Sequence, residues 1–218
     1  MVARTVITAS LEYEQKARAQ GFRLIAGLDE AGRGAWAGPV AAAAVILPLD
    51  RDDLAEVLAG VTDSKRLSAA RREELAPLIK SVALDWAVGR TNSDEVDKHG
   101  IIAATRIAME RALRKLELVP DYLLIDALEL PENVMPLEKQ LKITKGDLKS
   151  LSIAAASILA KVTRDAYMVG LDEQYPEYGF ARHKGYGTKE HRSSLAAHGP
   201  CFAHRKSFRP IMEWRMLF

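Results

Sequence analysis

The sequence predicts an α/β fold, in which strands and helices alternate along the chain and pack in layers. Two observations support this class. Short apolar runs with β-branched centres recur between segments whose apolar residues lie at helical spacing. The 218 residues, 48% hydrophobic and 28% charged, contain no internal repeat, low-complexity segment or Gly/Ser linker. We therefore expect one domain over residues 1–218, with residues 179–218 as a basic C-terminal portion.

Five segments have the composition of strands. Each is short and mainly apolar, and most end at a charged or turn-forming residue. Residues 40–47 are apolar throughout, which is typical of a strand buried on both faces. Residues 82–91 instead alternate between apolar and polar. In chain order, we expect strands at 24–28, 40–47, 82–91, 122–125 and 137–143.

The helices are expected where a capping residue precedes a helical pattern. Ser68, Asn92 or Ser93, and Ser150 occupy such positions. The small residues at 154–157 would allow a helix to pack closely against its neighbour. In chain order, we expect helices at 68–80, at 92–118 with an interruption near Gly100, at 150–172 and at 188–198, with one more short helix at the C-terminus.

Composition excludes several classes of protein. The single cysteine, Cys201, rules out a disulfide framework and a multi-cysteine zinc site, and a structural role is the favoured one. The longest apolar run, residues 40–48, is too short to span a bilayer. The charged N-terminus lacks a signal-peptide core, so we expect a cytoplasmic protein with no membrane association.

Charge is distributed unevenly along the chain. The total is +2, but residues 179–218 carry eight Lys/Arg and two acids, a net charge of +6 that leaves −4 for the remainder. Four of the five histidines also lie there. This asymmetry indicates an electropositive surface for a polyanion, and a solvated basic tail is the alternative.

Acidic residues stand where expected strands end. Asp29 and Glu30 follow one apolar run, and Asp126 follows another. Adjacent carboxylates repel each other unless a cation neutralises them. Mg²⁺ prefers carboxylate oxygens, so these residues predict a magnesium site, and exposed loop acids are the alternative.

A glycine-rich turn follows Asp29 and Glu30, and it permits two interpretations. Gly32, Gly34 and Gly38 after a strand suggest a dinucleotide-binding loop and hence a nucleotide-cofactor oxidoreductase. Their spacing is wrong for that fingerprint, and Trp36 and Pro39 would interrupt the required helix. Alternatively, glycines flanking an arginine let backbone N–H groups approach phosphate or ribose closely.

Taken together, eight blocks of sequence closely resemble the type 2 ribonucleases H, the bacterial ribonuclease HII group. The blocks span nearly the whole chain, and their number and order make the resemblance specific. They are GLDEAGRG (27–34), GPV (38–40), DSKRL (63–67), LID (124–126), KGD (145–147), IAAASILAKVTRD (153–165), HKGYGT (183–188) and HRKSF (204–208).

The resemblance implies a ribonuclease H-like mixed β-sheet flanked by helices, with a small C-terminal helical portion. It implies an endoribonuclease that cuts the RNA strand of RNA/DNA hybrids, and that cuts 5′ of single ribonucleotides embedded in duplex DNA. The family's metal-binding acids fall on Asp29, Glu30, Asp126 and Asp147, which would hold two Mg²⁺ or Mn²⁺ ions. From spacing alone, Asp147 could instead be a helix N-cap. The expected products carry a 5′-phosphate and a 3′-hydroxyl.

The resemblance also implies how RNA is distinguished from DNA. Backbone groups of Gly32, Arg33 and Gly34 would contact the 2′-hydroxyl and its phosphate, and Tyr186 would pack on the neighbouring deoxyribose. The alternative for Tyr186 is a turn residue that packs on its own loop. The expected phosphate contacts, each of which could also be a solvated charge, are Lys65, Lys161, Arg164, Lys184 and Arg205.

Other residues are expected to play minor roles. The histidines His183, His191 and His204 would donate to phosphate or simply cap and pack, without a catalytic role. Residues 214–218 weakly resemble C-terminal peptides that dock on sliding clamps, although a helix packed on the body is favoured. The chain shows no apolar exposed stripe, so we expect a monomer. A catalytically inactive hybrid-binding module is the alternative function.

Overall fold

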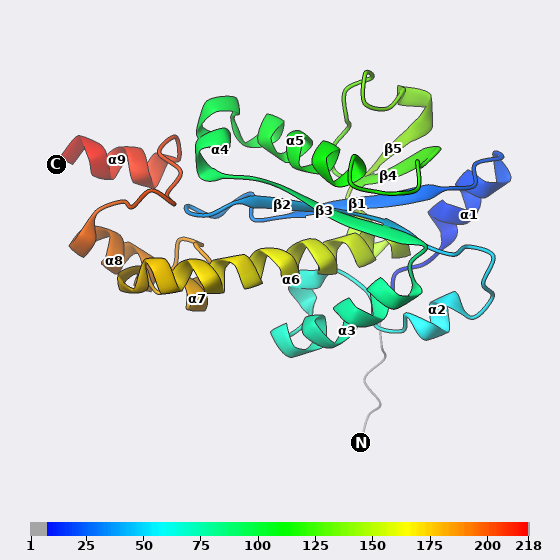
Figure 1. The fold of residues 1–218 in the computed structure, drawn as a ribbon, viewed down its shortest axis with the longest axis horizontal. Coiled ribbons are helices and arrows are strands. Elements are labelled where there is room, and N and C mark those ends of the chain that lie inside the picture. The colour runs from blue at the N-terminus through cyan, green and yellow to red at the C-terminus, as the bar shows by residue number, and fades with distance from the viewer. Residues whose placement is uncertain (1–7, 218) are drawn as a thin grey trace.

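A mixed β-sheet forms the centre of the structure, a computed structural model that describes the backbone of residues 8–217 and the side chains of residues 8–214 (Figure 1). Within these residues the sheet has five strands in the order β3-β2-β1-β4-β5. β1 is antiparallel to β2 and parallel to β4; β3 continues the antiparallel side and β5 the parallel side. The strands are β1 Ile25–Ala31, β2 Val40–Ile46, β3 Asp85–Thr91, β4 Tyr122–Asp126 and β5 Gln140–Ile143.

Helices cover both faces of this sheet. The long helix α6 runs along one face beside α3, and α4 and α5 cover the other (Figure 1). Shorter helices α7, α8 and α9 gather at the far end of α6. The helices are α1 Glu12–Ala19, α2 Leu54–Val57, α3 Ala69–Val82, α4 Ser93–His99, α5 Ile101–Leu113, α6 Leu151–Gln174, α7 Phe180–His183, α8 Lys189–His198 and α9 Arg209–Leu217.

The alternating side chains of β2 fill two cores. Ala43 and Val45 belong to the apolar cluster beneath α6 and α3, whereas Ala44 and Ile46 belong to the cluster beneath α5. Successive side chains of a strand point to opposite faces, so a strand of apolar residues supports both layers. Gly27 lets α6 approach β1, because a Cβ there would lie only 2.2 Å from the carbonyl carbon of Ser152.

The expected α/β fold is confirmed, with local differences. Asp29 and Glu30 lie inside β1 rather than beyond its end. The interruption expected near Gly100 is confirmed, because Gly100 adopts φ +77° between two helices, but the second helix ends at Leu113 rather than near residue 118. The strand expected from residue 137 begins at Gln140, after a 3₁₀ turn. Ser68, Asn92 and Ser150 cap their helices as expected.

The C-terminal helices are joined to the loop after β1. We call residues 32–38 the glycine loop. The Trp36 N–H donates to the Gly185 carbonyl (2.8 Å), and the Arg205 N–H donates to the Trp36 carbonyl (2.8 Å). The Gly38 N–H donates to the Ala203 carbonyl (2.9 Å). Among residues 8–217, no helix has the length and apolar character needed to cross a bilayer.

Candidate active site

Strand pairing brings the acids together. β1 and β4 run parallel with Leu28 opposite Ile125, so Asp29 and Asp126 follow at neighbouring positions. Asp126 accepts a hydrogen bond at Oδ1 from the Gly146 N–H (2.7 Å), which fixes the turn that carries Asp147. Asp147 lies in this turn, and the α6 cap is Ser150 instead. Three distant segments therefore bring their carboxylates into one neighbourhood.

The carboxylates raise one another's pKa. Burial raises the pKa of Asp29 well above its usual value, and the charges of Glu30 and Asp126 add to the shift. Burial also raises the pKa of Glu30, although Arg33 opposes the effect. Burial, Asp63 and Asp126 raise the pKa of Asp147 to about 6. Buried like charges of this kind require protons or a cation.

The donor set fits a hard divalent cation. All four acids offer oxygen, the ligand type that Mg²⁺ and Mn²⁺ prefer. Glu30 Oε2 is buried without a hydrogen-bond partner, while Oε1 pairs with Arg33 at 3.1 Å. Within the described part of the chain, no three His, Cys, Asp or Glu side chains are already arranged around a metal-sized space. The carboxylates are thus neighbours that would have to move closer around an ion.

Lys65 lies beside these acids. Burial alone would lower the pKa of its ammonium group, but Asp29, Asp147, Asp63 and Asp126 together raise it above the usual value. Asp63 accepts a hydrogen bond from the Lys65 N–H (2.8 Å) and so fixes the start of this turn. Lys65 therefore offers a positive charge at the edge of the carboxylates.

A cleft of about 450 Å³ is lined by Glu30 and by the expected RNA-reading residues, whereas Asp29, Asp126 and Asp147 do not line it. Its walls combine the start of the glycine loop, the turn after residue 63, α6 and the loop before α8. Seven of the expected site residues line it, namely Glu30, Gly32, Arg33, Gly34, Lys65, Lys161 and Tyr186, together with Ala31, Ser64 and Arg72. Lys161 pairs with Asp165 (2.8 Å), and its ammonium lies 5.4 Å from the centre of the Tyr186 ring.

Two glycines of the loop differ in what they require. Gly32 has φ +97°, and a Cβ there would lie 2.0 Å from Arg164 Nε. Gly34 has no positive φ, and a Cβ there would meet nothing within 4 Å. The fold therefore requires a glycine at position 32 and imposes no such requirement at position 34.

The expected phosphate contacts of Arg164 and Arg205 are wrong. Both side chains are fully buried. Arg164 donates to the carbonyls of Pro39 (2.9 Å) and Ala37 (3.2 Å). Arg205 donates to the carbonyls of Gly38 (2.9 Å from Nη2) and Arg33 (2.9 Å from Nη1). These carbonyls face inward, so the two guanidinium groups hold the glycine loop from beneath and do not reach solvent.

Lys184 lies outside the cleft. Its ammonium donates to the Ala181 carbonyl, and its side chain lines a neighbouring hollow with Arg72 and Asp165. Asp165 pairs with Arg72 at 3.7 Å. Lys184 therefore lines this neighbouring hollow and does not line the cleft.

Sequence reasoning missed three polar residues of the site. Asp63 raises the pKa of Asp147, Arg72 lines the cleft, and Ser157 hydrogen-bonds both Asp29 and Ser64. Asp63 stands two residues before Lys65, which was the available signal. Ser157 lies among small helix residues that suggested packing alone.

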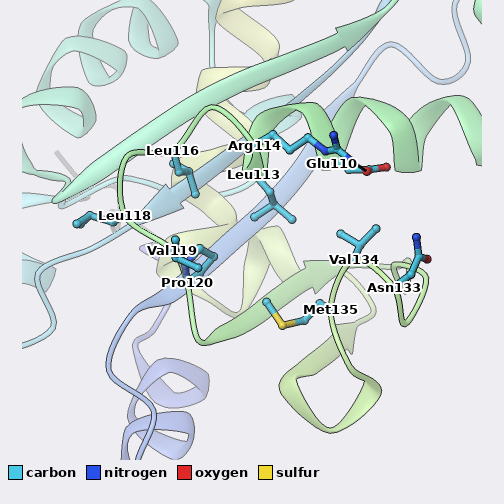
Figure 2. Close-up of a pocket in the computed structure, with 10 residues that line it drawn as sticks. All are labelled: Glu110, Leu113, Arg114, Leu116, Leu118, Val119, Pro120, Asn133, Val134 and Met135. Carbon is cyan, nitrogen blue, oxygen red and sulfur yellow. Dashed lines mark hydrogen bonds and ion pairs between the residues drawn. The ribbon is translucent and has the colours of Figure 1, made fainter.

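A second cavity lies away from these residues. Figure 2 shows that it opens between the end of α5, the loop before β4 and residues 133–135, with apolar side chains such as Leu113, Val119 and Val134 on its walls. None of the expected site residues lines it. The expected clamp-docking segment falls on residues 214–218, of which Phe218 and the side chains of residues 215–217 lie outside the described part of the chain.

Comparison with known proteins gives a consistent result. The family profile described as Ribonuclease HII matches residues 26–211. A ribonuclease HII of Roseiflexus castenholzii is 51% identical over 204 residues, covering 94% of this chain and 90% of that protein. The ribonuclease H2 structure from Pyrococcus horikoshii superposes with a TM-score of 0.75 at 25% identity, covering 89% of this chain and 98% of that chain.

A further solved structure, the PCNA:RNase HII complex from Archaeoglobus fulgidus, matches with a TM-score of 0.71 at 29% identity. The match covers 86% of this chain and 96% of that chain. All the residues of the cleft and of the acidic cluster lie within the segment matched by the family profile.

Proposed function

This chain belongs to the ribonuclease HII family, and from that premise we propose that its cleft hydrolyses the RNA strand of RNA/DNA hybrids. We further propose that it cuts 5′ of single ribonucleotides embedded in duplex DNA, leaving 5′-phosphate and 3′-hydroxyl ends. The observation that carries the proposal is the cleft, because Glu30, the start of the glycine loop and Tyr186 all line it.

Ribonucleases of this family use divalent metal ions. We propose that Asp29, Glu30, Asp126 and Asp147 hold two such ions, Mg²⁺ or Mn²⁺, which supply an activated water and stabilise the departing 3′ oxygen. The orphaned Glu30 Oε2 and the raised pKa of Asp147 support this assignment, since the first is a buried oxygen without a hydrogen-bond partner and the second reflects burial and neighbouring carboxylates.

The chain's own residues orient the substrate. Arg33 and Lys65 border the acids and supply positive charge for a phosphate on the RNA strand. The backbone of Gly32 and Gly34 lines the cleft, and at the exposed Gly34 it would accept close approach of a ribose 2′-hydroxyl, the group that distinguishes RNA from DNA. Tyr186 stands on the other side of the cleft, where it would pack on the next deoxyribose.

The basic C-terminal portion, residues 179–218, supports the same function. Its net charge is +6, while the rest of the chain carries −4. Arg205 is buried, but Lys189, Arg192 and Lys206 are exposed and would face the phosphates of a duplex. We propose that this portion binds the duplex backbone and that the protein acts as a monomer in the cytoplasm. A salt titration of hybrid affinity would count the phosphates it neutralises.

Product mapping tests the reaction. A duplex with one embedded ribonucleotide is incubated with Mg²⁺, with Mn²⁺ or with chelator, and the end groups are identified. Cleavage 5′ of the ribonucleotide with either ion, and none with chelator, supports the proposal. Tight hybrid binding without cleavage under any of these conditions would instead favour the inactive hybrid-binding module.

A contact with a sliding clamp is proposed through the C-terminus. The relative from Archaeoglobus fulgidus was solved as a complex with PCNA. Residues 214–218 here contain aromatic and aliphatic residues in a terminal position. Deletion of these five residues should weaken retention by an immobilised clamp, and unchanged retention would rule out the contact.

A further inference from the structure

A buried group of rings lies at the base of the loop that carries Tyr186. His191 and His204 are fully buried, and His183 stacks on His191 with ring centres 4.4 Å apart. Phe180 packs edge-on against His191 at 5.7 Å. Phe180 and His183 belong to α7 and His191 to α8, two helices that lie near the end of α6 (Figure 1). None of them lines the cleft.

The hydrogen bonds fix the tautomer of each histidine. The Cys201 N–H donates to His204 Nδ1 (3.0 Å), so in the neutral ring the proton lies on Nε2. That Nε2–H donates to His191 Nε2, which is 3.0 Å away. His191 therefore carries its proton on Nδ1, and Nδ1 donates to the Tyr186 carbonyl at 3.0 Å.

Neutral rings are what this arrangement requires. A proton added to His191 would place two N–H groups face to face across its contact with His204, and a proton added to His204 Nδ1 would face the Cys201 N–H. Burial lowers the pKa of both histidines to about 4, so both are neutral at neutral pH. The described residues contain no metal-binding arrangement among these rings and Cys201.

This chain of bonds ends on the residue expected to read the sugar. The Tyr186 carbonyl accepts from His191 and from the Thr188 N–H (2.8 Å), so both of its lone pairs are used. The Tyr186 N–H donates to the His183 carbonyl (2.9 Å). The backbone of Tyr186 is therefore held on both sides, while its side chain remains in the cleft.

The same histidines touch the opposite wall. His204 forms an antiparallel bridge with Ala37 of the glycine loop. The Trp36 ring lies 5.5 Å from the His191 ring. The pair thus connects Tyr186 to the glycine loop through the ring contact of His191 with Trp36 and the backbone bridge of His204, in addition to the backbone bond from Trp36 to Gly185.

We propose that His191, held in its Nδ1-protonated form by His204, is a positioning residue that sets the spacing between Tyr186 and the glycine loop and thereby the selectivity for an RNA-to-DNA junction. This inference rests on the proposed function of Tyr186. A junction requires both walls at a fixed separation, whereas a continuous RNA strand can be cut with the glycine loop alone.

Near-isosteric substitutions separate the two bonds of His191. The amide nitrogen of H191N lies close to the position of Nδ1, so it can still donate to the Tyr186 carbonyl but cannot reach His204. The amide of H191Q extends to the position of Nε2, so it meets His204 and loses the bond to Tyr186. The matched variant H204Q keeps a donor facing His191.

The readout is the ratio of kcat/KM on a duplex with one ribonucleotide to kcat/KM on a continuous RNA/DNA hybrid. We expect H191Q to lower this ratio tenfold or more, with kcat on the hybrid within threefold of wild type. H191N and H204Q should keep the ratio within threefold. A purely structural role would lower activity on both substrates together, and that result, or a ratio in H191Q equal to that in H191N, would overturn the inference.

If the proposed function itself is wrong, the same experiments give results that differ from those expected if only the inference about His191 is wrong. A wild-type protein that cuts neither substrate refutes the proposed function itself. An active wild type in which Y186A leaves the ratio unchanged refutes the role of Tyr186 and, with it, the inference from His191. Circular dichroism and thermal unfolding of each variant confirm that the compared proteins are folded.

Discussion

Replacing Gly34 by alanine should leave the stability of the fold intact and impair substrate binding. The added Cβ would meet nothing within 4 Å, and the backbone is not in the left-handed region. The variant should therefore be as stable as wild type or gain up to about 1 kcal/mol, because alanine reduces the entropy of the unfolded chain. The empty space around Gly34 is where we expect the ribose and its phosphate.

Activity should respond in the opposite direction. A methyl group at position 34 would keep the substrate from the backbone and remove a hydrogen bond worth about 1–3 kcal/mol when its partner is left unsatisfied. That corresponds to a loss of roughly 5- to 150-fold in kcat/KM on RNA/DNA hybrids. The loss should appear on both kinds of substrate, because both present a 2′-hydroxyl to the glycine loop.

Gly32→Ala is the matched control. Its φ of +97° is strained for alanine, and the Cβ would lie 2.0 Å from Arg164 Nε, which two backbone carbonyls hold in place. We expect destabilisation of about 2 kcal/mol or more, a decrease in Tm of roughly 4–8 °C for a chain of this size. Thermal unfolding and steady-state kinetics on both variants test the reasoning. A Gly34→Ala protein with wild-type kcat/KM, or with a Tm as low as that of Gly32→Ala, would refute it.

Three further predictions follow from the acids and the histidines. Asp126→Asn should keep the bond from the Gly146 N–H and hybrid binding yet lose at least about 100-fold in single-turnover cleavage; a rate near that of wild type would contradict the assignment of the acids. The increase in Tm caused by Mg²⁺ should grow as pH rises through about 6, because a protonated Asp147 cannot bind the ion; equal increases at pH 5 and pH 8 would refute this. His191 and His204 have folded pKa values of about 4, below the usual 6.5, so their contribution to stability is complete above pH 6.5 and is lost as pH falls toward 4. The free energy of unfolding should fall by at most about 3 kcal/mol for the first proton bound. Chemical denaturation of wild type and H204Q across this pH range should show the smaller decrease in H204Q. Parallel plots of unfolding free energy against pH for the two proteins would contradict the prediction.

Most of the fold was predictable because local signals agree with the tertiary structure. Apolar runs mark the strands, and the capping residues Ser68, Asn92 and Ser150 mark where helices begin. The end of β1 was not predictable, because two charged residues normally end a strand. In the structure, β2 continues to pair with Asp29 and Glu30, so the strand extends to Ala31.

The sequence predicted that the acids are neighbours, but it predicted the surroundings of the basic residues less well. The pairing of β1 with β4 and the bond from the Gly146 N–H to Asp126 bring the acids together, and the position of Asp29, Glu30 and Asp126 directly after apolar runs gave a usable signal. Arginine is normally exposed, so the sequence placed Arg164 and Arg205 on the surface. Only the tertiary structure shows that inward-facing carbonyls of the glycine loop accept their donors. Asp63 was missed for a similar reason, because its effect on Asp147 depends on proximity across 84 residues of sequence.

The bonds that hold the glycine loop have a consequence for biosynthesis. The partners of Trp36 and Gly38 include the backbones of Ala203 and Arg205, close to the end of the chain. A nascent polypeptide that has left the ribosome as far as residue 180 already contains all four acids, but it lacks the segment that shapes the loop. The glycine loop can therefore take up this arrangement only after residues 203–205 have been synthesised.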